Sequence, residues 1–217
     1  MLDCLIVVDV QNDFLPGGAL AVARGDEVVP VANALMPVFR RVIATQDWHP
    51  RAHGSFAANH FGRAVGEVMM LGGADQVLWP VHCVQETDGA AFAPELDVGR
   101  IGHVVRKGTD PAIDSYSGFF DNDQRKSTGL EALLRAHGEA RVWVLGLATD
   151  YCVKATALDA LRLEIPFATY AAPVDGPALS EGIDVYECLT ALGVAASRGA
   201  AKRLLEQGGV SINGAKL

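Results

Sequence analysis

Three side chains of this 217-residue chain combine the chemistry of a base, a cation and a nucleophile. Asp9, Lys107 and Cys152 each come shortly after an apolar run that reads as a buried strand. A carboxylate at the carboxyl end of a parallel strand lies where open α/β sheets place their sites. If the sheet brings the three together, Asp9 can take the thiol proton while Lys107 supports the carboxylate and the thiolate. The set therefore predicts nucleophilic catalysis by Cys152.

Cys152 lies between an apolar run and a segment with helical spacing at residues 155–161. At such a strand-to-helix turn, backbone N–H groups and the helix dipole stabilise a thiolate and could receive an oxyanion. The alternative is an inert buried cysteine, the usual role of a single Cys. Lys107 alone would be a solvated charge. Asp9 alone would be a turn or cap residue, a role that suits Asp13 better. Only the combination favours catalysis.

A second cluster has the residue types of a metal site. Asp47 and His49 are alternate residues just beyond the predicted strand at residues 41–45, so both could point to the same side. His53 and His82 lie in the same irregular region. One carboxylate and two imidazoles leave coordination positions open for water or substrate, as a catalytic divalent-metal site requires. The alternative, histidines that serve as surface or hydrogen-bonding groups, is not excluded by spacing alone.

The elements that must position these groups alternate along the chain. Apolar runs predict core strands, and apolar residues at helical spacing predict helices. We expect strands at residues 5–8, 41–45, 104–106 and 142–145, and helices at residues 27–39, 128–136 (capped by Thr128) and 155–161. This alternation predicts an α/β fold, a three-layer, doubly wound, mostly parallel sheet with helices on both faces. Residues 50–84 are too irregular for that pattern and are expected to form a long functional loop.

Bulk composition limits the class of protein. The length suggests one domain, or one domain with a small appendage, and half of the residues are hydrophobic, enough for a sizeable core. No apolar run is long enough to span a bilayer, and the N-terminus begins a strand rather than a signal peptide. Four scattered cysteines fit a reducing, cytoplasmic setting. A formal charge of −8 excludes a broad nucleic-acid-binding surface.

The motifs around these residues closely resemble the nicotinamidase branch of the isochorismatase-like cysteine hydrolases, over about residues 2–161. They are DVQNDF at 9–14, TQDWHP at 45–50, HGSF at 53–56, LWPVHCVQ at 78–85, KG at 107–108 and GLATDYCVKAT at 146–156. The resemblance implies a catalytic triad of Asp9, Lys107 and Cys152. It also implies an oxyanion hole made by the backbone N–H groups of Ala148 and Cys152.

The same resemblance implies a metal-dependent amidohydrolase acting on a linear carboxamide. Asp47, His49 and His82 would bind one divalent ion (zinc, iron or manganese), with Ser55 near its water shell. The implied reaction converts nicotinamide to nicotinate and ammonia, a step of NAD salvage in pyridine nucleotide biosynthesis. The alternatives are an amidohydrolase of another small amide or carbamoyl substrate, and an RNA-interacting protein with a vestigial hydrolase domain. The sequence leaves open whether the protein forms a homo-oligomer.

The resemblance also implies how the substrate is held and cleaved. Phe14 and Trp79 would flank the pyridine ring, and a cis peptide bond would precede Ala148. The pyridine nitrogen would bind the metal, which orients the ring and its carboxamide. Cys152 would attack the amide carbon, ammonia would leave with a proton from Asp9, and water would hydrolyse the thioester.

The C-terminal tail departs from this resemblance. Nicotinamidases continue with a further strand, a stretch like Asp-Ala/Gly-Cys-Arg-Gly, and a closing helix and strand. Residues 165–170 are expected to be that strand, but the rest is absent from the sequence. PVDGP at 173–177 breaks the chain, so we predict a hydrolase domain at 1–176 and a short helical appendage at 177–217. From residue 185 onward the tail is net basic.

The tail is similar to the small RNA-binding module that closes bacterial tyrosyl-tRNA synthetases, although it is truncated. In that module Ser197 would cap a helix carrying Arg198, Lys202 and Arg203 toward phosphates, and residues 210–213 would begin a hairpin. The alternative is an amphipathic helix with a solvated basic face that replaces the missing closing helix. We favour the structural role, because three cations would give only weak, salt-sensitive RNA binding.

Overall fold

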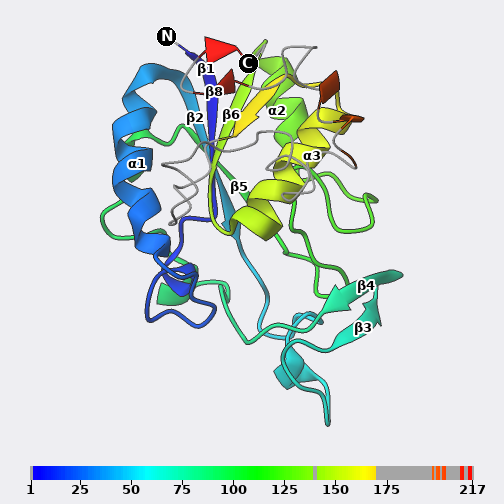
Figure 1. Ribbon diagram of the computed structural model, residues 1–217. Coiled ribbons are helices and arrows are strands. Elements are labelled where there is room, and N and C mark those ends of the chain that lie inside the picture. Colours follow the sequence, from blue (N-terminus) through cyan, green and yellow to red (C-terminus); the bar gives the residue numbers. More distant parts are fainter. Residues whose placement is uncertain are drawn as a thin grey trace.

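The computed structural model describes residues 2–138 and 141–169 and, in the tail, residues 197, 199–200, 202–203, 211–212 and 215–216. Its main sheet has five strands in the order β5-β2-β1-β6-β7 (Figure 1). They are β1 (Leu2–Val8), β2 (Phe39–Asp47), β5 (His103–Lys107), β6 (Val142–Gly146) and β7 (Phe167–Thr169). All neighbouring pairs are parallel, so all five strands end at the same edge of the sheet.

Helices cover both faces of this sheet, as the predicted three-layer α/β fold requires. Helix α1 (Val28–Leu35) lies on one face, and α2 (Leu130–Ala136) and α3 (Lys154–Arg162) lie on the other (Figure 1). The central strand β1 is apolar on both sides because Leu5 and Val7 face one layer while Ile6 faces the other. None of the described helices has the length and apolar character needed to cross a bilayer.

Two predicted helix boundaries need correction. The helix expected at residues 27–39 ends earlier, at Leu35, and a 3-10 turn at Met36–Val38 leads into β2. Pro37 explains the early end, because proline has no backbone N–H to donate to the Asn33 carbonyl and so cannot continue the α-helix. At α2 the N-cap is Gly129, not Thr128. Thr128 still supports the helix start, because its Oγ1 accepts a hydrogen bond from the Leu130 N–H at 3.2 Å.

The loop predicted at residues 50–84 contains an antiparallel hairpin, which the sequence interpretation missed. Its strands are β3 (Val68–Leu71) and β4 (Ala74–Val77), and it projects away from the sheet (Figure 1). Gly72 and Gly73 make the turn with φ values of 64° and 100°, which favour glycine. A Gly-Gly pair between two short runs is a hairpin signal, so the element was open to prediction.

The described part of the tail contains two of its predicted local features. The Ala200 N–H donates to Ser197 Oγ at 3.2 Å, and residues 199–200 and 202–203 are helical, as the predicted cap requires. The short strands β8 (Ser211–Ile212) and β9 (Ala215–Lys216) pair antiparallel, as the predicted hairpin requires. Arg198 and the boundary expected at residues 173–177 lie outside the described residues. The division into two domains stays a prediction.

Candidate active site

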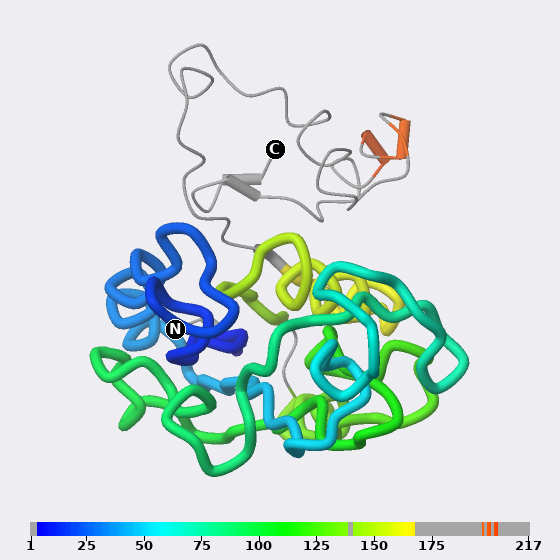
Figure 2. The backbone as a smooth tube through the Cα atoms, turned by 90° about the horizontal axis from the view of Figure 1, so that it is seen from below, coloured from blue at the N-terminus to red at the C-terminus, as the bar shows by residue number. Residues whose placement is uncertain are grey.

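The three predicted catalytic residues meet at the carboxyl edge of the sheet. Asp9 follows β1, Lys107 is the last residue of β5, and Cys152 lies in a π-helical turn at Thr149–Val153, between β6 and α3. β2 and β5 lie beyond β1 on one side, and β7 lies beyond β6 on the other. The chain therefore leaves β1 toward one side of the sheet and leaves β6 toward the other. Between these two strand ends lies the crevice in which α/β sheets bind ligands. Seen from below, loops from distant parts of the sequence surround this end of the sheet (Figure 2).

Lys107 is the centre of a buried polar cluster. Its Nζ lies 2.8 Å from Asp9 Oδ2 and 3.5 Å from Cys152 Sγ, and it donates to the Ser115 carbonyl at 2.9 Å. It also donates to Asp47 Oδ1. Burial alone would lower the pKa of Lys107, but the carboxylates of Asp47 and Asp9 hold it well above its ordinary value. The side chain therefore stays a cation in the core.

Asp9 is the proton acceptor nearest to the thiol. Its carboxylate is fully buried, and its Oδ1 accepts a hydrogen bond of 2.6 Å from Thr45 Oγ1. Burial raises the pKa of Asp9 to about 6, although Lys107 opposes the rise. Asp9 is thus ionised at neutral pH and becomes protonated in mild acid, which suits a group that must take and return a proton.

Cys152 is a protonated thiol in the resting site, which corrects the expectation of a thiolate stabilised by the turn. Burial raises the pKa of Cys152 well above its ordinary value, and Lys107 offsets this only in part because Asp9 and Asp47 add negative charge. Ligand atoms of Asp9, Asp47 and Cys152 lie within 4.8 Å of one another. A nucleophilic Cys152 would therefore need a base, and Asp9 as that base stays a prediction.

The backbone around Cys152 has two unusual features. The peptide bond between Leu147 and Ala148 is cis, as the family resemblance implies. Gly146 has a φ of 136°, and a Cβ there would lie 2.0 Å from the Val8 carbonyl oxygen, so only glycine lets β6 approach β1 so closely. Ala148 and Cys152 both line one cavity beside this turn. Their role as an oxyanion hole stays a prediction.

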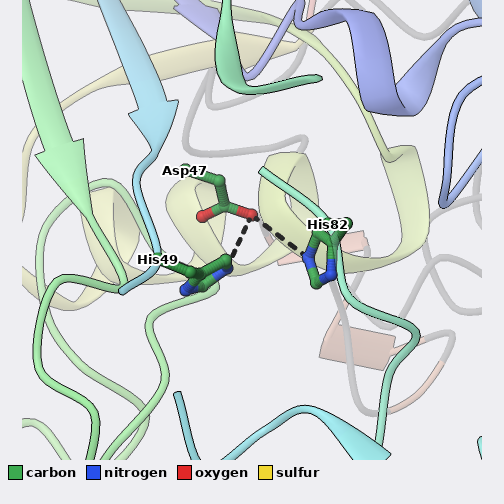
Figure 3. Close-up of side chains that lie close together, drawn as sticks. All are labelled: Asp47, His49 and His82. Carbon is green, nitrogen blue, oxygen red and sulfur yellow. Dashed lines mark ion pairs between the residues drawn. The ribbon is translucent and has the colours of Figure 1, made fainter. Parts of the chain in front are cut away.

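The predicted metal ligands also come together (Figure 3). Asp47 Oδ2 lies 3.5 Å from His49 Nε2 and 3.9 Å from His82 Nε2, and all three side chains are buried. Burial would raise the pKa of Asp47, but Lys107 and His49 hold it below its usual range. The cluster thus offers one carboxylate and two imidazoles that converge on one point.

The orientation of the two imidazoles fits a metal. His49 Nδ1 lies 2.9 Å from the Gly108 carbonyl oxygen and His82 Nδ1 lies 2.8 Å from the Pro80 carbonyl oxygen, so each Nδ1 carries the proton. In its neutral form, each ring then presents the Nε2 lone pair toward Asp47, whose negative charge raises the pKa of His49. The Nε2 of His49 is buried and has no hydrogen-bond partner in the described structure. A carbonyl–histidine pair that aims a free nitrogen is the usual support of a metal ligand.

Ser55 and His53 lie beside this cluster. Ser55 Oγ lies 2.7 Å from His53 Nδ1, and the His53 ring centroid lies 4.4 Å from that of His49. Burial, together with His49, lowers the pKa of His53 to about 4, so its ring is neutral. Ligand atoms of His49, His53 and Asp114 form a second converging set. The Ser55 hydroxyl is engaged with His53, and its contact with a metal-bound water stays a prediction.

Two further residues of the DVQNDF motif support the site. The Asp47 N–H donates to Gln11 Oε1 at 2.8 Å, and Gln11 Nε2 donates to the Asp47 carbonyl at 2.9 Å. Gln11 therefore fixes the backbone of a metal-ligand candidate, a role that the sequence interpretation missed. Asp13 has the predicted turn role, because it accepts hydrogen bonds from the Ala19 N–H at 3.2 Å and the Cys83 N–H at 2.6 Å.

A cavity of about 220 Å³ joins the two clusters. It is lined by Phe14, Leu20, Ala21, Val22, Asp47, Trp79, His82, Asp114, Tyr116, Ala148, Asp150, Tyr151 and Cys152. Phe14 and Trp79 thus line the same cavity as Cys152, and their place on either side of a pyridine ring stays a prediction. The volume is below the roughly 300–1,000 Å³ of drug-sized sites, so a small ligand fits best.

One wall of this cavity is aromatic and includes residues that the sequence interpretation did not single out. Trp79, Tyr116 and Tyr151 pack edge to face, with ring centroids 5.0 to 6.4 Å apart. Asp114 lines the same wall. The three rings come from three separate segments, the stretch after the hairpin, the loop after β5 and the turn before α3, so no single local motif contains them.

Comparison with known proteins agrees with this geometry. Residues 3–170 match the model of the Isochorismatase domain family. The chain is 51% identical over 163 residues to the nicotinamidase of Escherichia coli, which covers 73% of this chain and 76% of that protein. The match to the family model ends at residue 170.

Solved structures show the same likeness. The nicotinamidase and pyrazinamidase of Acinetobacter baumanii matches with a TM-score of 0.79 at 39% identity, over 93% of this chain and 97% of that one. The pyrazinamidase of Pyrococcus horikoshii in complex with zinc matches with a TM-score of 0.65 at 36% identity, over 92% and 97%. The chain belongs to the isochorismatase domain family, and it is an amidohydrolase.

Proposed function

We propose that this protein is a nicotinamidase, which hydrolyses nicotinamide to nicotinate and ammonia. The observation that carries the proposal is that Cys152, held beside Lys107, lines one small cavity together with the metal-ligand candidates Asp47 and His82. A nucleophile beside a site for a ring nitrogen suits an aromatic amide. The similarity to the Escherichia coli nicotinamidase supports this choice of substrate.

The first half of the reaction uses Cys152 and Asp9. As Sγ attacks the carboxamide carbon, the thiol proton passes to the Asp9 carboxylate, and the carbonyl oxygen takes the negative charge. The N–H groups of Ala148 and Cys152 would stabilise that oxyanion. When the C–N bond breaks, Asp9 returns the proton to the leaving nitrogen, so ammonia departs and a thioester remains on Cys152.

The second half reverses these roles with water. Asp9, now ionised again, takes a proton from water as the water oxygen attacks the thioester carbon. The C–S bond breaks, and the Cys152 sulfur recovers a proton from Asp9. Nicotinic acid leaves and gives its proton to solvent to become nicotinate, and both groups return to their starting states. Lys107 keeps its charge throughout and stabilises the ionised form of Asp9.

Asp47, His49 and His82 would hold one divalent ion beside the ring. Such an ion would supply a Lewis-acid site for the pyridine nitrogen, and thus orient the carboxamide toward Cys152. Phe14 and Trp79 would flank the ring in the cavity. Zinc is the first candidate, because the pyrazinamidase of Pyrococcus horikoshii was solved with zinc. Iron and manganese are the alternatives.

The test is release of ammonia from nicotinamide, with pyrazinamide and benzamide as comparison substrates. We expect turnover of the first two and much weaker turnover of benzamide, which has no ring nitrogen. Absence of nicotinamide turnover, with turnover of another small amide or carbamoyl compound, would favour the alternative of a related amidohydrolase.

We further propose that the protein works in the cytoplasm, because the buried Cys83 and Cys152 form no disulfide, which fits a reducing compartment. A homo-oligomer and RNA binding by the tail stay predictions. The RNA-interacting alternative, with a vestigial hydrolase domain, is disfavoured because Asp9, Lys107 and Cys152 form an intact cluster.

A further inference from the structure

A buried glutamine outside the cavity connects two residues of its wall. Gln76 lies on β4 and is 2% exposed. Its Nε2 lies 3.0 Å from the Tyr116 hydroxyl, 3.2 Å from Asp114 Oδ2 and 2.8 Å from the Val77 carbonyl oxygen. Its Oε1 accepts a hydrogen bond of 3.3 Å from Asn122 Nδ2. The amide therefore links the hairpin to the loop that follows β5.

The orientation of this amide is determined by its neighbours. Asp114 Oδ2 and the Val77 carbonyl oxygen only accept hydrogen bonds, so the NH₂ group must face them and the carbonyl oxygen must face Asn122. The two N–H groups of the amide then face three acceptors, and the Tyr116 hydroxyl oxygen, 3.0 Å from Nε2, shares one N–H with a neighbouring acceptor.

The Tyr116 hydroxyl is a junction between Gln76 and the cavity. Its oxygen accepts hydrogen bonds from Gln76 Nε2 and, at 3.1 Å, from the Trp79 indole Nε1. Two donors therefore face this oxygen, and the position of the Trp79 ring depends on where the oxygen lies. Trp79 and Tyr116 both line the cavity, whereas Gln76 does not.

We propose that Gln76 is a positioning residue that fixes the aromatic wall of the substrate cavity through the Tyr116 hydroxyl and the Trp79 indole. This inference rests on the proposed function in that the wall is taken to hold the substrate ring. Without the Gln76 N–H groups, the buried oxygens of Asp114 and Tyr116 lose a hydrogen-bond donor. These side chains then shift to find another donor, and the wall shifts with them. The reacting groups are held separately, by β1, β5 and the turn after β6. The loss should therefore fall on substrate binding and leave the chemical step largely intact.

The first experiment measures steady-state kinetics on nicotinamide with the full chain. For Gln76→Met, we expect KM to rise about tenfold while kcat changes by no more than about twofold. Gln76→Glu keeps the shape but loses the donor, so its KM should rise at least as much. In a Tyr116→Phe background the effect of Gln76→Met should largely disappear, because the two changes remove the same link.

Asn33 supplies the matched control. Its amide also ties two segments, since Nδ2 donates to the Glu95 carbonyl at 2.7 Å and Oδ1 accepts from the Asp97 N–H at 2.8 Å, but it lies away from the cavity. Asn33→Ala should lower the melting temperature without changing KM. If Gln76→Met shows the same pattern, or if its effect adds fully to that of Tyr116→Phe, the inference is wrong.

A second measurement needs no substrate and so separates this inference from the proposed function. In a Trp48→Phe, Trp143→Phe background, Trp79 is the remaining tryptophan of the sequence. Gln76→Met should shift its emission maximum and increase its quenching by acrylamide, and Asn33→Ala should do neither. Unchanged Trp79 emission would overturn the inference even if nicotinamide is turned over. A clear shift in a protein that does not hydrolyse nicotinamide would refute only the proposed function.

Discussion

The reaction centre and the aromatic wall of this protein are positioned by different means. Asp9 and Lys107 sit at strand ends, where parallel pairing with β2 sets their spacing. The wall residues Trp79, Tyr116 and Tyr151 lie on loops and on the turn before α3, and a chain of side-chain hydrogen bonds from Gln76 holds two of them. Strand ends thus position Asp9 and Lys107, whereas loops and the turn before α3 position the aromatic wall.

This contrast has a physical reason. A strand in a parallel sheet is held by backbone hydrogen bonds on both sides and by apolar packing on both faces, so its end moves little. A loop keeps its shape only if its side chains bond to one another. We therefore expect changes at the strand ends to affect kcat, and changes in the wall to affect KM.

The largest effect should come from the nucleophile. Cys152→Ala should lower kcat by at least about 10⁴-fold and leave nicotinamide binding largely intact, because only the thiol forms the covalent intermediate. Cys4→Ala, in the core strand β1, is the control and should keep most of the activity. Kinetics and calorimetric binding would check both. Appreciable turnover by Cys152→Ala would exclude the proposed mechanism.

Next in size should be the loss of the metal ligands. His82→Ala should lose bound metal and lower kcat/KM by about 100-fold or more, since the ring is no longer oriented. Exhaustive chelation should have the same effect, and added zinc should reverse it. His103→Ala, which changes an exposed histidine of β5, should keep its metal. Elemental analysis measures the bound metal, and kinetics on nicotinamide measures kcat/KM. Full activity in a metal-free protein would favour a related amidohydrolase with another substrate.

The pH dependence tests the state of Asp9. Its raised pKa, about 6, means that the carboxylate is lost as the pH falls through that value. A protonated Asp9 cannot accept the thiol proton, so kcat/KM should fall on the acid side by about tenfold per pH unit below that point. A control scan of protein fluorescence should show that the fold persists over this range. Undiminished activity at pH 5 would remove Asp9 from its role as the base.

The smallest expected effect is that of the tail. A chain that ends at Gly176 should melt several degrees lower or be less soluble, if the tail covers apolar surface of the hydrolase domain. Its activity at low temperature should persist, because the described site residues lie within residues 9–152. A truncated protein as stable as the full chain, with loss of salt-sensitive RNA binding, would instead support an RNA-binding module.

Much of the fold could be predicted because its signals are local. Apolar runs marked the strands, and the alternation of strand and helix indicated a parallel sheet with two covered faces. The errors were local as well. Pro37 ended α1 early, and the Gly72-Gly73 pair that makes the hairpin was not used. Asp9, Asp47 and Lys107 could be found because each stands at the end of a recognisable strand.

The sequence by itself determined which groups reach the carboxyl edge of the sheet, because strand ends and motifs are properties of neighbouring residues. Only the tertiary structure decided the pKa of Cys152. Folding buries the thiol and brings the charges of Asp9 and Lys107, which are distant in the sequence, close to it. It alone also joined Gln76 to Tyr116, which are 40 positions apart. Hydrogen bonds between distant loops have no local pattern, because they exist only after the chain has closed those loops.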